Sequence, residues 1–460
     1  MAREFRESSI DQMFLLPPDI REWLPAEHRA WFVSETLDAV DITAIEQTYR
    51  SKSGTGPKAY SPRMMLKILV YGYCVGVRSS RKLERATIEQ VAFRVLSAGQ
   101  HPDHDTIAGF RKAHLKQIEG LFLQVLNLCK KAGLVKLGHL VLDGTKIKAS
   151  ANKSKSRTYE KLNKGEQELR EQIRAMLEDA ERIDEEEDEI YGKGKKEEDL
   201  PKELHNREKR LEKIQELKKQ MEEEAEIERK KVQDEVKKRR EEDKQWNEST
   251  GQKIEGRYPQ EPGVGKKPLI TESRRNPTDF DSRIMKENRT GGFIQGYNCQ
   301  AVVDENQIMV VAEVTNQNND KGLAPLMMEK VKSNTGKHPD QLSADAGYFG
   351  ERDLVRLSHI DCYIPPLEKD KGKRLIETGK GKITLTEAMK QKLESPEGKK
   401  LYKKRKTIVE PVFGQIKEAQ CFRQFLLRGM EKVAAEWQLI AMCHNLNKMF
   451  TLQNRVSIVC

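Results

Sequence analysis

Apolar residues recur at helical spacing through the first third of the chain. Ser61-Pro62, a pair typical of helix starts, precedes the apolar run 64–70, and a second stripe follows Gly99. The second stripe steps by three and four residues and contains Ile107, Phe110, His114, Ile118, Leu121 and Val125. Arg111 and Lys112 lie off this stripe. The pattern predicts an all-α domain over residues 1–135 whose basic helix face binds DNA, with an ordinary helical bundle and solvated charges as the alternative.

A second helical pattern, much richer in charge, occupies residues 160–246. Its first half carries a heptad stripe formed by Leu169, Ile173, Met176, Ala180 and Ile183. After the break at 191–201 a similar stripe runs from Leu204 to Val236. Because each stripe must bury itself against something, we predict an inserted antiparallel helical hairpin. The part between Met221 and Arg240 is charged enough to stand free in solvent. A solvated structural arm is the simplest interpretation, with dimerisation or DNA contact as the alternative.

Strand patterns lie on either side of this hairpin. The apolar run 139–142 ends at Asp143, and residues 145–149 alternate as in a continuing strand or hairpin. A basic linker rich in Gly and Pro spans 247–290. Beyond it come two strands that turn at 304–307, a helix, a strand that ends at Asp345, a short helix and a last strand. This order predicts an α/β core, a mixed sheet flanked by helices, built from residues 136–159 and 291–460. It resembles the RNase H-like layout, interrupted after its first strand by the hairpin.

Composition adds information about partners and compartment. The chain has 460 residues, enough for two or three domains, and a formal net charge of +10 that favours an acidic polymer as partner. Seven scattered cysteines without a C-x-x-C pair argue against a disulfide framework and against structural zinc. No apolar run approaches the ~18–20 residues of a membrane span, and the N-terminus lacks the apolar core of a signal peptide. We therefore expect a cytoplasmic protein that works where its nucleic acid is.

Three acidic residues form the pattern that carries chemistry. Asp143 and Asp345 each end an apolar strand, and both should emerge at one sheet edge if those strands are parallel neighbours. Glu410 precedes Pro411, so it is expected near the start of a helix, where Lys406 and Lys417 share its face. Carboxylates in such an arrangement suit two hard cations about 3.5–4 Å apart that assist phosphoryl transfer. Asp304 is a rival acid, but its hairpin turn favours a structural role.

The motifs LDGTK, ADAGY and a Tyr-Arg-Glu-Lys pattern followed by PVFGQIK resemble the DDE transposases of bacterial insertion sequences. The similarity extends to PDHDTIAGFR, the charged insertion and SRIMKENRTGGFIQGYNCQAVVD, and so covers nearly the whole chain. It implies an RNase H-like core in which Asp143, Asp345 and Glu410 bind two Mg²⁺ or Mn²⁺ ions. It also implies that Tyr402, Arg405 and Lys417 contact transposon-end DNA. Four residues separate Arg405 from Glu410 where the family usually has three, so Lys406 is the alternative cation.

The resemblance implies a transposase that binds double-stranded transposon ends, cuts them and joins them to target DNA. Because two ends must meet in one complex, a homodimer on DNA is expected, associated with the bacterial nucleoid. Two alternatives belong to other classes. One is a catalytically inactive DNA-binding descendant of such an element, and the other is an interaction protein organised around the charged hairpin.

Overall fold

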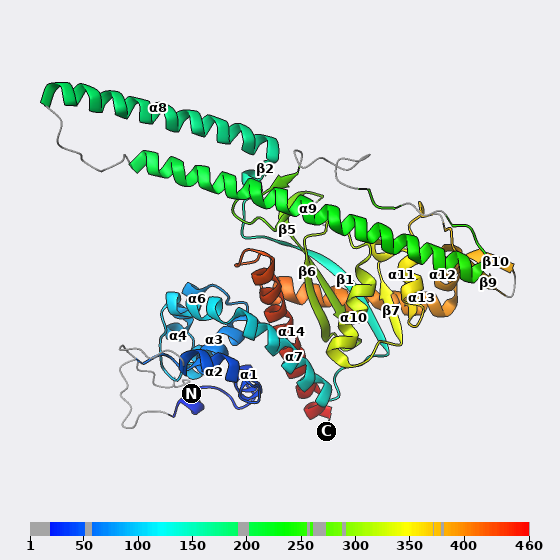
Figure 1. Cartoon of the computed structure of the whole chain (residues 1–460). Coiled ribbons are helices and arrows are strands. Elements are labelled where there is room, and N and C mark those ends of the chain that lie inside the picture. The colour runs from blue at the N-terminus through cyan, green and yellow to red at the C-terminus, as the bar shows by residue number, and fades with distance from the viewer. Residues whose placement is uncertain are drawn as a thin grey trace, which may run out of the picture.

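A six-stranded mixed sheet forms the centre of the computed structural model, which describes residues 19–50, 58–191, 202–254, 258–260, 273–287, 291–370, 372–378 and 381–459 (Figure 1). Its strands are β1 (His139–Lys148), β4 (Arg283–Lys286), β5 (Phe293–Val303), β6 (Met309–Thr315), β7 (Gln341–Ala344) and β8 (Asp361–Tyr363). The order is β4-β5-β1-β7-β8, and β6 also pairs with β5. β1 runs antiparallel to β5 and parallel to β7, and β7 runs parallel to β8. The long charged insertion therefore separates two strands, β1 and β5, that are neighbours in the sheet.

The N-terminal helices share one hydrophobic core with the sheet. They are α1 (Arg29–Asp38), α2 (Thr43–Arg50), α3 (Pro62–Cys74), α4 (Ser80–Glu89), α5 (Val91–Leu96), α6 (His104–Ala113) and α7 (Leu115–Lys131). The last helix of the chain, α14 (Met430–Val459), packs against α3, α7 and β6. Its Trp437 is fully buried and donates from Nε1 to the carbonyl of Gln300 on β5, 3.1 Å away. α14 thus joins the helical segment to the sheet. None of the described helices is both long and apolar enough to cross a bilayer.

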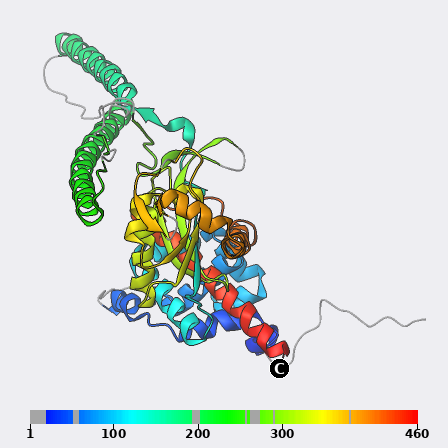
Figure 2. The same cartoon turned by 90° about the vertical axis from the view of Figure 1, so that its right-hand side faces the viewer.

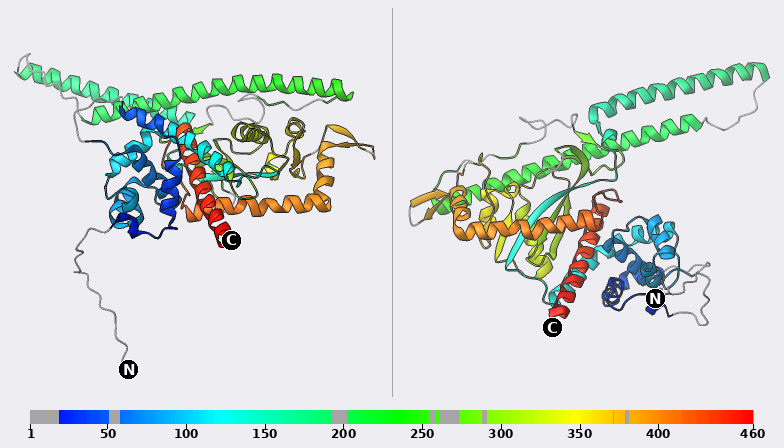
Figure 3. Two further views of the ribbon diagram at one scale, coloured as in Figure 1. Left: turned by 90° about the horizontal axis from the view of Figure 1, so that it is seen from below. Right: turned by 180° about the vertical axis from the view of Figure 1, so that it is seen from behind.

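The part of the chain that follows β6 contributes further helices around the sheet. They are α10 (Leu323–Thr335), α11 (Glu351–Arg356), α12 (Leu385–Glu394) and α13 (Pro396–Gly414), of which α13 packs on β1, β7 and β8. Two small ladders complete the strands, β2 (Arg157–Thr158) with β3 (Arg274–Arg275) and β9 (Leu375–Thr378) with β10 (Gly381–Thr384). Seen from below, the sheet lies between α13 and the long insertion helix α9 (Lys202–Thr250) (Figure 3).

The expectation that Glu410 stands near a helix start is wrong. α13 begins at Pro396, capped by Ser395, and Pro411 lies inside the helix. A proline at 411 removes the N–H that would bond to the carbonyl of Thr407 one turn earlier. That carbonyl instead accepts from Nε2 of Gln307, 3.1 Å away, in the turn between β5 and β6. The helix therefore continues through Pro411 because a side chain from another element replaces the missing donor.

Replacing Gln307 by Ala should lower the free energy of unfolding by roughly 0.5–1.5 kcal/mol, because the Thr407 carbonyl loses its donor. In a Pro411→Ala background the new N–H of residue 411 can bond to that carbonyl, so the same substitution should cost less. Urea unfolding of the wild type, the two single variants and the double variant measures the cost of Gln307→Ala in each background. The loss of other Gln307 contacts is the same in both backgrounds, so it cancels in the difference. Equal costs in the two backgrounds would contradict this role for Gln307.

The insertion between β1 and β5 is a long antiparallel pair of helices that extends from the body (Figures 1 and 2). α8 (Tyr159–Tyr191) and α9 contact each other near the base through Leu162, Leu217 and Met221. Beside this apolar contact, Glu166 on α8 binds Lys218 of α9 at 2.6 Å. Lys218, together with Arg170 and Gln215, lowers the pKa of Glu166 to about 2. An apolar contact and an ion pair at the base thus hold the two helices together.

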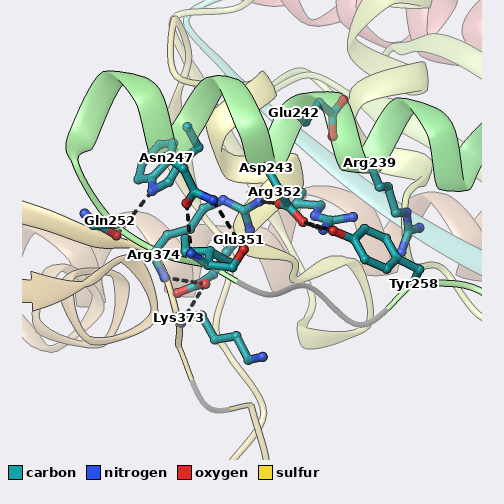
Figure 4. Close-up of polar contacts among 12 residues, drawn as sticks. Arg239, Glu242, Asp243, Asn247, Gln252, Tyr258, Glu351, Arg352, Lys373 and Arg374 are labelled. Carbon is teal, nitrogen blue, oxygen red and sulfur yellow. Dashed lines mark hydrogen bonds and ion pairs between the residues drawn. The ribbon is translucent and has the colours of Figure 1, made fainter.

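The expectation that residues 221–240 stand free in solvent is also wrong. Met221 and Val232 are buried, and Glu224 binds Arg275 and Arg283. Farther along α9, Asp243 is only 3% exposed and forms ion pairs with Arg352 of α11 and, at 2.6 Å, with Arg374 (Figure 4). Glu224 and Asp243 of α9 therefore form ion pairs with residues beyond the insertion, although they were expected to be solvated.

Replacing Asp243 by Asn should destabilise the attachment of α9 by roughly 3–5 kcal/mol, because two arginines at a buried position lose their counter-charge. Glu248→Gln is the matched control, since Glu248 lies on the same helix and its side chain is 66% exposed. Limited proteolysis should then cut the insertion faster in the first variant, while the control behaves as wild type. Equal cleavage rates would show that the buried ion pairs do not hold the helix.

Candidate active site on the central strands

Asp143 and Asp345 directly follow the last residues that pair between the parallel strands β1 and β7. The register of β1 and β7 ends at Leu142 opposite Ala344, so the next residue of each chain is one of the two acids. Asp345 begins a short 3₁₀ turn and its Oδ1 accepts from the backbone N–H of Gly347 at 2.9 Å. Apolar, buried strands thus deliver two half-buried carboxylates to the same edge of the parallel part of the sheet.

Asp143 is not at a strand end, however. β1 continues to Lys148 because β5 pairs with it as far as Lys148 opposite Gly296. Only the parallel partner β7 stops, so Asp143 stands in a strand that is supported on one edge and open on the other. The alternation of residues 145–149 belongs to this continuing strand.

Burial dominates the electrostatics of the two acids. Desolvation raises the pKa of Asp143 to about 6, opposed by Arg405 and reinforced by the charge of Asp345. Desolvation likewise raises the pKa of Asp345, opposed by the N–H of Gly347. Two carboxyl groups that are costly to ionise together favour a positive charge beside them. The only cation that touches Asp143 in the described part of the chain is Arg405, whose Nη1 lies 3.0 Å from Oδ2.

Helix α13 brings two more of the expected site residues to the acids. The Arg405 side chain is 13% exposed, and its guanidinium lies 5.8 Å from the centre of the Tyr402 ring. The charges of Asp345 and Asp143 both raise the pKa of Tyr402, after the larger effect of burial. Lys406 is exposed and makes no such contact. Arg405, and not Lys406, is therefore the cation beside the acids in this structure.

Lys417 and Glu410 occupy different places. Nζ of Lys417 lies 2.6 Å from Oγ1 of Thr145, two residues beyond Asp143 on the same face of β1. Glu410 is exposed, five residues after Arg405 on α13. Across the described ranges, no three acidic, histidine or cysteine side chains converge closely enough to hold an ion together. The structure thus brings Asp143, Asp345, Tyr402 and Arg405 together but does not bring Glu410 to them.

The expected surface role of Arg111 requires a correction. Arg111 is 8% exposed, and its guanidinium donates to the hydroxyl of Tyr73 and to the carbonyl of Arg78. The charge of Arg111 also opposes the burial that raises the pKa of Glu436. The residue lies off the apolar stripe yet faces a polar part of the interior, so it is a buried counter-charge. Lys112 is exposed.

Asp304 has the structural role expected of it. Its side chain is fully buried and accepts from the backbone N–H groups of Lys136, Asn306 and Ile308. These bonds shape the turn between β5 and β6. The three N–H groups leave Asp304 little capacity to bind anything else.

Sequence reasoning missed one acid of the site, Asp320. It lies between β6 and α10, and its charge raises the pKa of Asp143, Asp345 and Tyr348, in each case after the effect of burial. The only local signal is the polar stretch NQNND before Lys321, which is typical of an ordinary loop. Its position becomes visible only when the sheet is assembled.

Comparison with protein families gives two matches. Residues 18–113 match a model described as Transposase domain (DUF772), and residues 367–450 match a model described as Transposase DDE domain. The second range contains Tyr402, Arg405, Glu410 and Lys417, whereas Asp143 and Asp345 lie outside both ranges. The comparisons with curated proteins and with solved structures found no match.

These two matches show the class of the protein, which is a transposase. More particularly, the chain belongs to the DDE transposases of insertion sequences, as the LDGTK, ADAGY and PVFGQIK motifs predicted. It is an enzyme of a mobile element, and members of this family normally use divalent metal ions.

Replacing Arg405 by Gln should raise the pKa of Asp143 above its present value of about 6, because the guanidinium favours the ionised carboxylate. The folded pKa already exceeds the ordinary 3.8, so ionising Asp143 opposes folding as pH rises from about 4 through about 6. The substitution should extend that window upward. Carbon-13 NMR titration of the carboxyl signals, assigned with Asp143→Asn, measures the shift.

Lys406→Gln is the matched control, because it removes the same charge from the exposed neighbouring position. It should leave the pKa of Asp143 unchanged. Equal shifts in the two variants would show that the ion pair between Arg405 and Asp143 does not persist in solution.

Proposed function

We propose that this transposase binds the ends of its insertion sequence and catalyses metal-dependent DNA cleavage and strand transfer with Asp143, Asp345 and Glu410. The observation that carries the proposal is the register of β1 and β7, which sets Asp143 and Asp345 side by side with Arg405 against them. Glu410 belongs to the range that matches the DDE model, and its helix packs on both strands.

We further propose that the catalytic core is RNase H-like. The order β6-β5-β1-β7-β8, with an antiparallel first half and a parallel second half, supports this assignment. The core would comprise residues 136–159 and 291–460, joined by the helical insertion and the basic linker 247–290. Residues 1–135 would form the helical DNA-binding domain, with Lys112 on its surface.

The donor set fits divalent cations. Carboxylate oxygens are the ligands that Mg²⁺ and Mn²⁺ prefer, and among the described residues Arg405 is the one cationic side chain in contact with Asp143. Asp143, Asp345 and Glu410 would hold two such ions. When bound, the ions would supply activation of the attacking water or 3′-hydroxyl and stabilisation of the leaving oxygen.

The protein's own cations would position the DNA. Once it leaves Asp143, Arg405 can bind a phosphate with its planar guanidinium, which lies over the Tyr402 ring. Lys417 would contact a neighbouring phosphate beside Thr145. Phosphate contacts of this kind make binding strongly dependent on salt. No covalent link between protein and DNA is required. A homodimer would hold the two transposon ends in one complex.

The test is cleavage and joining of DNA that carries the element's terminal repeat, with Mg²⁺ or Mn²⁺. Asp143→Asn, Asp345→Asn and Glu410→Gln should each lower the cleavage rate by at least about 100-fold. Altering a residue that only supports a metal ligand already costs up to about 100-fold, and a ligand itself should cost at least as much. Each variant should still shift the DNA in a gel. Asp340→Asn, at the opposite end of β7, is the control and should cut normally.

Two outcomes would contradict the proposal. If the wild type binds the ends and never cuts, the chain is a DNA-binding protein without turnover. If Glu410→Gln alone cuts at the wild-type rate, Asp143 and Asp345 keep their proposed catalytic roles, and another residue supplies the third carboxylate.

A further inference from the structure

Asp320 is held in place by amide groups of the strand next to β1. Its Oδ1 accepts from Nδ2 of Asn298 at 2.7 Å and from Nε2 of Gln300 at 2.9 Å, both on β5. Gln300 is itself fixed, because its Oε1 accepts from the hydroxyl of Tyr348. One oxygen of the carboxylate is therefore oriented by two donors, while Oδ2 receives no hydrogen bond from the described residues. A carboxylate held in this way has one oxygen available to a ligand.

The available oxygen faces Asp345 across a space that glycine keeps open. A Cβ built on Gly347 would stand 2.9 Å from Oδ1 of Asp345 and 3.3 Å from Oδ2 of Asp320. The two carboxylates thus border the same point, and any side chain at 347 would begin in close contact with both. Two oxygens of separate carboxylates around one small gap are the arrangement that a hard cation needs.

A buried oxygen without a partner lies beside the same group. Asn298 is fully buried and its Oδ1 has no hydrogen-bond partner among the described residues. That oxygen lies 3.1 Å from where a Cβ of Gly144 would stand, directly after Asp143. Buried polar atoms of this kind are normally satisfied, so the Asn298 oxygen calls for a further partner, such as a water bound to an ion.

We propose that Asp320 is a further carboxylate ligand of the divalent cation site at Asp345. The inference rests on the proposed function, because it adds a ligand to that metal centre. Asp345 would then contribute to two cation positions, one beside Asp143 and one beside Asp320. Asn298 and Gln300 would be positioning residues that act through Asp320.

The simpler reading is that Asp320 only supports the loop before α10, where its carbonyl accepts from the N–H of Leu323. Asp320→Asn separates the two readings. Asparagine keeps an oxygen for Asn298 and Gln300 but places an amide at the oxygen that faces Asp345. A supporting role predicts unchanged cation binding, whereas a ligand role predicts its loss.

The experiment measures Mn²⁺ binding to the full chain without DNA, and the electron paramagnetic resonance signal of free Mn²⁺ is the readout. Asp320→Asn should bind Mn²⁺ at least ~10-fold more weakly than the wild type. The control Asp340→Asn removes the same charge from an exposed position and should bind normally. Wild-type affinity in Asp320→Asn would overturn the inference.

Gly347→Ala is the second variant, in case Asp320→Asn fails to fold. It removes no charge but fills the gap between the two oxygens, and it should also weaken Mn²⁺ binding. Normal binding by Gly347→Ala would then count against the inference. If Asp143→Asn and Asp345→Asn also bind Mn²⁺ normally, the proposed metal centre itself fails. If those two bind weakly while Asp320→Asn does not, only the role of Asp320 is lost.

Discussion

The site depends on the unequal support of strand β1. On one edge β5 pairs with it to Lys148, while on the other β7 leaves after Ala344. β1 therefore stays paired as a strand beyond the point where its parallel neighbour ends. Asp143 thus lies beside Asp345 where β7 ends, and the Asp345 side chain stabilises the turn by which β7 departs. A sheet with equal support on both edges would bury these carboxyl groups or separate them.

Placing two half-buried carboxylates side by side is costly, and the surrounding helices offset part of that cost. Arg405 supplies the counter-charge, so α13 must keep a fixed position on the sheet. Its passage through Pro411 depends on Gln307, whose own carbonyl lies 2.8 Å from Nε2 of His444 on α14. A turn of the sheet, the helix with Arg405 and the last helix are thus linked by one residue. The insertion is anchored separately, through Asp243, to α11 and to Arg374 just before β9.

Much of the fold was predictable because it follows local periodicity. The N-terminal helices, the two long insertion helices and the strands carrying Asp143 and Asp345 each leave a spacing of apolar residues in the sequence. The errors share one cause. Pro411 indicated a helix start because proline usually interrupts a helix, yet a side chain about 100 residues away supplies the missing donor. Charged residues of α9 and Arg111 appeared solvated because their buried partners lie far along the chain.

By itself, the sequence determined the family, the elements and two of the acids, since motifs and periodic patterns are properties of short segments. The tertiary structure decided which groups meet. It set Arg405 rather than Lys406 against Asp143, left Glu410 exposed, and brought Asp320 from an ordinary polar loop to the side of Asp345. Contacts of this kind join residues from different strands and helices. They depend on sheet register and helix packing, which no local spacing of residues records.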